Sequence, residues 1–146
     1  MVHNVANIQF HLNRSAYFCH ANQNIFYMKP LIAWVEIPAT DFGRAVKFYN
    51  AVLNLRLQEL DFGNEKMACF PGGEGAVSVA PGFNPSSDGL LVSFHVPDSM
   101  EQSLQRVVEN NGNVVIPKTK IEADGRGYFS VFTDSEGNKV GLYSDF

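Results

Sequence analysis

The residues from Leu31 to Leu53, LIAWVEIPATDFGRAVKFYNAVL, decide the fold of this chain. They open with an apolar run of strand length that ends at Pro38. Thr40 and Asp41 then supply side-chain oxygens that accept hydrogen bonds from the free amides at a helix start. Apolar residues follow at the 3.6-residue spacing of a helix with one buried face. The stretch therefore predicts a strand, a short turn and an amphipathic helix.

The same pattern recurs about 60 residues later, from Leu90 to Gly112, as LLVSFHVPDSMEQSLQRVVENNG. An apolar strand again ends at a proline, and Ser99 and Gln102 have the spacing of a capping box at a helix start. The glycine that closes the stretch predicts a left-handed helix stop. The side chains expected on the buried face of this helix are Met100, Leu104, Val107 and Val108.

Each copy is followed by three further strand-like runs, at 55–62, 65–70 and 76–80 in the first and at 114–116, 127–133 and 139–144 in the second. The segment that begins at Pro117 is expected to leave the sheet. Turn-forming residues between Pro81 and Gly89 predict the connector between the copies. The chain is therefore predicted to be an α+β protein with two βαβββ repeats, residues 28–82 and 88–146, forming a curved mixed sheet.

Length and composition bound the classes of function. A chain of 146 residues with a net charge of −4 is one domain's worth of protein and offers no basic patch for nucleic acid. No apolar run approaches the ~20 residues that cross a membrane, so no membrane partner is expected. The two cysteines, Cys19 and Cys69, form neither a disulfide framework nor a zinc spacing. A cytoplasmic protein is expected.

The first 27 residues differ from the rest of the chain. All 15 acidic residues lie beyond position 27, whereas three of the four histidines lie before it. One interpretation is that residues 1–27 are a leader or extension, with Met28 as the functional start of a single domain spanning 28–146. The other is that residues 8–12 or 16–19 add an edge strand at a subunit contact. The histidines and Cys19 have no recognised metal-binding spacing.

Several motifs between Leu31 and Ser144 carry a family resemblance. They are the strand–Pro–x–Thr–Asp helix start, the pair Phe48-Tyr49 followed by Val52-Leu53, the segment Pro85-Ser86-x-Asp88-Gly89-x-Leu91-Val92, the segment Ile116-Pro117-Lys118-Thr119, and the closing Asp134-x-Glu136-Gly137-Asn138 hairpin. With these motifs the chain resembles the vicinal oxygen chelate superfamily, which includes glyoxalase I, extradiol dioxygenases, fosfomycin-resistance enzymes and bleomycin-resistance proteins. The resemblance implies the glyoxalase/bleomycin resistance fold. It says less about any one reaction, because the fold serves many.

The superfamily's chemistry implies a divalent metal held by His or Glu from the first and last strands of each repeat. Carried over one by one, those positions fall on Trp34, Val79, Leu91 and Gly141, none of which is a usual metal ligand. Shifts of two residues, which keep a side chain on the same face of a strand, reach Glu36 in the first strand and Ser93 or His95 in the fifth. The resemblance therefore implies the fold without its metal, and no cofactor is expected.

A cup without a metal would present a different set of side chains to a ligand. Those expected in it are Trp34, Glu36, Met67, Cys69, Leu91, Ser93 and Lys118. The indole of Trp34 suits stacking on an aromatic molecule, and the carboxylate of Glu36 suits binding an ammonium group or acting as a base. Two alternatives stay open: Trp34 fills the core, and Glu36 pairs with a lysine such as Lys118.

Two functions follow from the resemblance. The first is a metal-free protein, similar to the bleomycin-resistance branch, that binds a small aromatic or cationic molecule in a cup near a homodimer interface. The second is a lyase or isomerase similar to lactoylglutathione lyase, which uses Glu36 as a base or a metal with atypical ligands. The missing ligand set favours the first function, and metal analysis separates the two.

Overall fold

The computed structural model of this chain describes residues 32–146. Both interpretations of residues 1–27, and the expected domain start at Met28, fall outside that part. Within it, the first repeat contains β1 (Val35–Pro38), α1 (Phe42–Val52), β2 (Gln58–Asp61), β3 (Lys66–Cys69) and β4 (Gly75–Val79). The second contains β5 (Val92–His95), α2 (Met100–Glu109), β6 (Asn113–Lys120), β7 (Tyr128–Thr133) and β8 (Lys139–Ser144).

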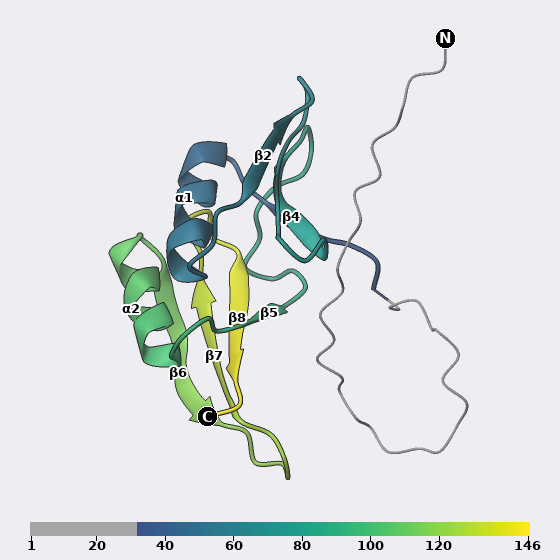
Figure 1. The fold of residues 1–146 in the computed structure, drawn as a ribbon. Coiled ribbons are helices and arrows are strands. Elements are labelled where there is room, and N and C mark those ends of the chain that lie inside the picture. The colour runs from purple at the N-terminus through teal and green to yellow at the C-terminus, as the bar shows by residue number, and fades with distance from the viewer. Residues whose placement is uncertain (1–31) are drawn as a thin grey trace, which may run out of the picture. The chain divides into compact units, whose positions relative to one another are not determined.

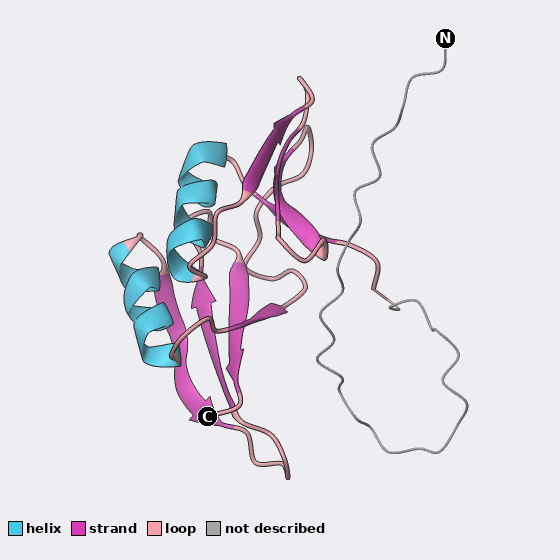
Figure 2. Ribbon diagram, in the orientation of Figure 1, coloured by secondary structure: helices cyan, strands magenta, loops and turns pink. Residues whose placement is uncertain are grey.

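Each repeat forms a four-stranded mixed sheet with the same strand order. The first sheet runs β1-β4-β3-β2 and the second β5-β8-β7-β6, and in both the first and last strands of the repeat pair in parallel. The predicted α+β fold with two βαβββ repeats is confirmed (Figures 1 and 2). No helix among residues 32–146 is long and apolar enough to span a membrane.

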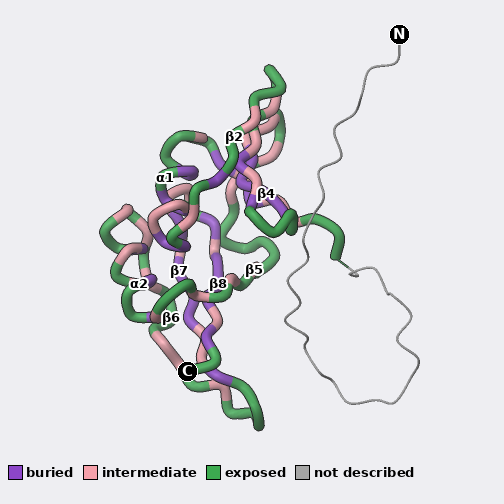
Figure 3. The backbone as a smooth tube through the Cα atoms, in the orientation of Figure 1, coloured by how far each residue is buried: buried purple, intermediate pink, exposed green. Residues whose placement is uncertain are grey.

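The two helices lie side by side and pack against the sheets (Figure 1). The largest side chains that they bury with the strands are Phe48, Tyr49, Val52, Met100, Val107, Phe132 and Leu142. Figure 3 shows this buried layer in purple along the inner side of α1 and strands β7 and β8. Val108 was expected in the layer but is 60% exposed. The buried residues of α2 are Met100, Ser103 and Val107, and Val108 lies about 100° further round the helix.

The helix ends follow the predicted capping chemistry in part. Asp41 Oδ1 accepts a hydrogen bond from the Arg44 amide at 3.0 Å, as predicted. Ser99 caps α2 by accepting a hydrogen bond from the Gln102 amide, as predicted. The Ser99 amide, however, donates to Asp98 and not to the side chain of Gln102, so the second hydrogen bond of the capping box does not form. The left-handed residue after α2 is Asn111, with φ of 68°, and not the expected Gly112.

The sixth strand is longer than the sequence predicted. β6 continues from Asn113 through Pro117 to Lys120, whereas the chain was expected to leave the sheet at Pro117. β6 is an edge strand, so a residue without an N–H is tolerated on its open side. The pairing with β7 shifts register on both sides of Ile116, which shows how the sheet accommodates the proline.

Candidate functional site

Strand β1 presents two different faces, because successive side chains alternate. Ile37 is 3% exposed and packs in the core beneath the helices, so Trp34 and Glu36 point to the opposite face of the first sheet. The indole Nε1 of Trp34 donates a hydrogen bond to Glu36 Oε1 at 2.9 Å. The Trp34 side chain is therefore held in place while the residue remains 42% exposed.

The strand register adds two of the other predicted residues to this face. Glu36 lies in register with Ala76 and then Cys69, and Pro38 with Ser78 and then Met67. Met67 and Cys69 on β3 are both half-buried and share the face with Trp34 and Glu36. On β4, the strand between β1 and β3, Ser78 is fully buried, and its Oγ has no hydrogen-bond partner in the described part of the chain.

The second sheet has an equivalent face on β5. Val140 and Leu142 belong to the core, so Ser93, which pairs with Gly141, points away from it, as does Leu91. A Cβ at Gly141 would lie 2.2 Å from Ser93 Oγ and 3.1 Å from Ser93 Cβ. The absence of a side chain at Gly141 thus gives Ser93 its space.

Lys118 lies apart from these residues. Its ammonium is 2.8 Å from Glu101 on α2 and 4.6 Å from the centroid of the Tyr128 ring. The alternative pair between Glu36 and Lys118 therefore does not form, and the Glu36 carboxylate bonds to Trp34 instead.

The residues at the superfamily's metal positions do not fit a divalent metal. Trp34, Val79, Leu91 and Gly141 supply no carboxylate, imidazole or thiolate. The two-residue shift to Glu36 reaches a carboxylate that already accepts the indole N–H. Residues 32–146 contain no group of three His, Cys, Asp or Glu side chains that could hold a metal ion.

The hairpin between β7 and β8 fixes β1 and α1 relative to the second repeat. Its Glu136 side chain is fully buried, and Oε2 accepts from the amides of Thr40 and Asp41, both at 3.0 Å. Arg44 donates to both carboxylate oxygens, at 2.6 and 2.9 Å. Burial raises the pKa of Glu136, but the hydrogen bonds from Arg44, Asp41 and Thr40 outweigh it and lower the pKa to about 2. Glu136 is therefore ionised at neutral pH.

Two further side chains of this hairpin complete what we call the clasp, namely Asp134, Glu136 and Asn138. Tyr49 of α1 donates from its hydroxyl to Asp134 Oδ2 at 2.7 Å, and burial together with the Asp134 charge raises the pKa of Tyr49 well above its ordinary value. Asn138 donates to the carbonyl of Pro38 and accepts from the amide of Ser86. The sequence contained this hairpin as a motif, but no periodicity in it indicated that it binds the first repeat.

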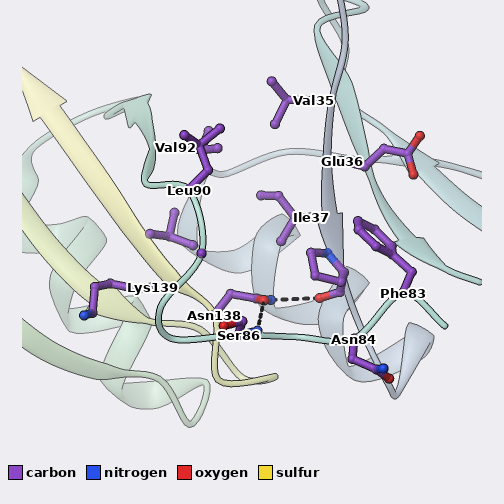
Figure 4. A pocket seen from close by; sticks show the side chains of 13 residues that line it. Val35, Glu36, Ile37, Phe83, Asn84, Ser86, Leu90, Val92, Asn138 and Lys139 are labelled. Atoms are coloured by element: carbon purple, nitrogen blue, oxygen red, sulfur yellow. Dashed lines mark hydrogen bonds between the residues drawn. The ribbon is translucent and has the colours of Figure 1, made fainter.

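A cavity of about 270 Å³ lies between β1 on one side and β5 and β8 on the other (Figure 4). The apolar residues Val35, Ile37, Leu90, Val92 and Val140 line it, and Phe83, Asn84, Ser86 and Gly89 of the connector form another wall. Of the predicted site residues only Glu36 lines this cavity, and its carboxylate points away from Ile37 and Leu90 in Figure 4. Sequence reasoning missed the cavity, because strand periodicity does not show which strand edges meet across two repeats.

Comparisons with known proteins place this geometry in context. The family model described as "Glyoxalase/Bleomycin resistance protein/Dioxygenase superfamily" matches residues 31–142. No curated protein matches the sequence.

Solved structures share the fold at low identity. Glyoxalase I from Zea mays is 19% identical with a TM-score of 0.60, over 77% of this chain, and this chain spans 45% of the maize protein. A glyoxalase/bleomycin resistance protein/dioxygenase family enzyme from Burkholderia phytofirmans is 15% identical with a TM-score of 0.59, over 79% of this chain and 98% of its own. The fosfomycin resistance protein FosX from Listeria monocytogenes, solved with Mn(II) and sulfate, is 14% identical with a TM-score of 0.60, over 80% and 91%.

Proposed function

This chain belongs to the glyoxalase/bleomycin resistance protein/dioxygenase superfamily, and from its site residues we propose that it is a metal-free protein that binds a small aromatic or cationic molecule on the β1 face at Trp34 and Glu36. The residues at the superfamily's metal positions carry no suitable donors. What the β1 face offers in their place is an aromatic ring beside a carboxylate.

The observation that carries this proposal is the hydrogen bond of 2.9 Å between Trp34 Nε1 and Glu36 Oε1. It fixes an indole ring that is 42% exposed, so a ligand that stacks on the ring need not order it first. The second oxygen, Glu36 Oε2, has no hydrogen-bond partner in the described part of the chain. A planar cation over the ring gains a cation–π contact of roughly 0.5–2 kcal/mol and lies close to that carboxylate.

A homodimer with the ligand near the subunit boundary is part of the proposal. Ile32 leads into β1, and Leu90 and Leu91 lead into β5, and all three are between 49% and 84% exposed. Burying such residues against the same surface of a second copy would form a two-fold contact. Sedimentation at micromolar protein should give a dimer, and replacing Leu90 and Leu91 by Ser should shift it toward monomer. A monomeric wild-type protein would contradict this part.

The ligand is tested with two probes of equal shape, the cation 1-methylquinolinium and the neutral 1-methylnaphthalene. Trp34→Ala is expected to weaken binding of the cation about 2- to 30-fold, the range that corresponds to a cation–π contact. Glu36→Gln should weaken the cation and leave the neutral probe unchanged, because it removes charge without changing shape. Titration calorimetry supplies the dissociation constants.

The control is Glu59→Gln, the same chemical change at an exposed position on β2 of the same sheet. It should leave both affinities unchanged. If neither Trp34→Ala nor Glu36→Gln affects the cation, or if Glu59→Gln weakens it as much as Glu36→Gln, the ligand does not bind at this face.

A further inference from the structure

We propose that the cavity between β1 and β5 is a second binding site, separate from the Trp34–Glu36 face, for an uncharged apolar molecule of about the size of a bicyclic aromatic. The site goes beyond the proposed function, because its walls come from the other side of β1 and from the second repeat. Val35 and Ile37 alternate with Trp34 and Glu36, so the apolar lining of the cavity lies on the face of β1 opposite to Trp34, and Glu36 only borders it.

The floor and sides of the cavity are aliphatic. Ile37 and Val140 are 3% and 2% exposed, Val35 and Val92 are half-buried, and Leu90 is 84% exposed at the rim. Figure 4 shows Leu90 and Val92 on one side of the space and Val35 and Ile37 on the other. Water against such walls gains few hydrogen bonds, so an apolar molecule that displaces it is favoured.

The polar groups at the end of the cavity are already paired. Asn138 Nδ2 donates to the Pro38 carbonyl and to Asp134 Oδ2, and Asn138 Oδ1 accepts from the Ser86 amide. The Ser86 hydroxyl accepts from the Asp88 amide. The amide of Asn138 is therefore already paired, and the side-chain amide of Asn84, which also lines the cavity, points away from Ile37 in Figure 4. A polar ligand gains little at Asn138 and Ser86.

The charged groups of the two ionisable residues at the cavity point away from its apolar lining (Figure 4). The Glu36 carboxylate is held by Trp34, and in Figure 4 both it and the ammonium of Lys139 point away from Ile37. A charged ligand would lose hydration in the cavity without gaining an ion pair. The geometry thus selects an uncharged molecule.

The volume sets the size of the ligand. An apolar cavity of about 150 Å³ in another protein holds benzene. The 270 Å³ here is nearly twice that volume, which suits two fused rings or an aliphatic group of similar size. Leu90, which lines the cavity, is 84% exposed, so a molecule can reach this side of the cavity without unfolding a strand.

The test uses the full chain and cis-decalin, an uncharged bicycle of similar size that has no aromatic ring to stack on Trp34. Val92→Phe places a ring in the cavity and should weaken binding at least about tenfold. Val115→Phe is the matched control, since it makes the same change at an exposed position on β6, far from the cavity lining. Binding should be unchanged there and also in Trp34→Ala. Transfer of magnetisation from protein methyl groups to the probe, measured by NMR, reports binding directly.

A second variant guards against a folding defect in Val92→Phe. Phe83→Ala removes an apolar wall of the cavity at a half-buried position outside both the core cluster and the proposed dimer contact, and it should weaken binding about threefold without affecting the melting temperature. The proposal is overturned if both variants bind the probe like the wild type, or if Trp34→Ala alone abolishes binding. The proposal is also overturned if the wild type does not bind the probe and Val92→Phe changes the sedimentation coefficient of the protein. That combination would mean that a second copy of the chain fills the cavity. Loss of cation binding in Trp34→Ala concerns only the Trp34–Glu36 face and does not contradict the cavity as a second site.

Discussion

Replacing Glu136 by Gln should destabilise the protein by about 2 kcal/mol at pH 7. The pKa of Glu136 falls from its ordinary 4.5 to about 2, and each unit corresponds to about 1.36 kcal/mol, so the ionised carboxylate stabilises the fold by at most roughly 3 kcal/mol. Arg44, its charged partner, is 46% exposed, and solvent screening reduces that value. The amide of Gln also places N–H donors against the donors of Thr40, Asp41 and Arg44.

The pH dependence gives a sharper signature. A depressed pKa in the folded protein contributes stability above pH 4.5, and this contribution is lost as pH falls from 4.5 toward 2. The wild type should therefore lose about 2 kcal/mol more than Glu136→Gln over that interval, and the two proteins should approach equal stability near pH 2.

Urea unfolding followed by circular dichroism at a series of pH values measures both effects. Glu122→Gln makes the same change at an exposed side chain that forms no ion pair within residues 32–146, and it serves as the control. If Glu136→Gln costs no more than Glu122→Gln at pH 7, or if its stability falls with acid as steeply as that of the wild type, the account of the clasp is wrong.

Three further predictions concern the core and the site. Tyr49→Phe removes the buried hydroxyl that donates to Asp134, and it should lower the free energy of unfolding by about 1–2 kcal/mol in the same urea assay; no change would show that Asp134 is satisfied without it. Gly141→Ala brings a methyl group against Ser93 and should cost about 1–3 kcal/mol, most of which Ser93→Gly restores in the double variant; purely additive costs would refute the shared space. Protein purified without added metal should contain no near-stoichiometric zinc, nickel, manganese or iron, and elemental analysis that finds one would contradict the metal-free proposal.

The sequence predicted the architecture because the periodic signals were local. The apolar runs and the cap at Asp41 each depend on neighbouring residues. Errors arose where tertiary context decided. Pro117 remained in the sheet because β6 is an edge strand, and Val108 is exposed because α2 buries Ser103 instead. Neither fact can be read from the residues around them.

The placement of the candidate residues was predictable in part. Trp34 and Glu36 share a face because they are two residues apart on one strand, which parity alone dictates. The alternation of side chains along a strand could not predict where the Lys118 ammonium lies, because its partner Glu101 is on a helix 17 residues away. The cavity depends on how two strand edges approach each other, and the clasp depends on contacts across about 95 residues. Contacts between residues so far apart in the sequence produce no periodic pattern in the residues around them, so the sequence alone does not predict them.

The clasp residues, which hold the two repeats together, are distinct from the residues of the proposed ligand face. Asp134, Glu136 and Asn138 bind helix starts, strand carbonyls and the connector, whereas Trp34, Glu36 and Ser93 point from the opposite faces of the sheets. A mutant library restricted to that second group should retain a high proportion of folded members. Selection on such a library can therefore vary the exposed sheet faces while the scaffold stays intact, which makes the chain a practical starting point for engineered small-molecule receptors.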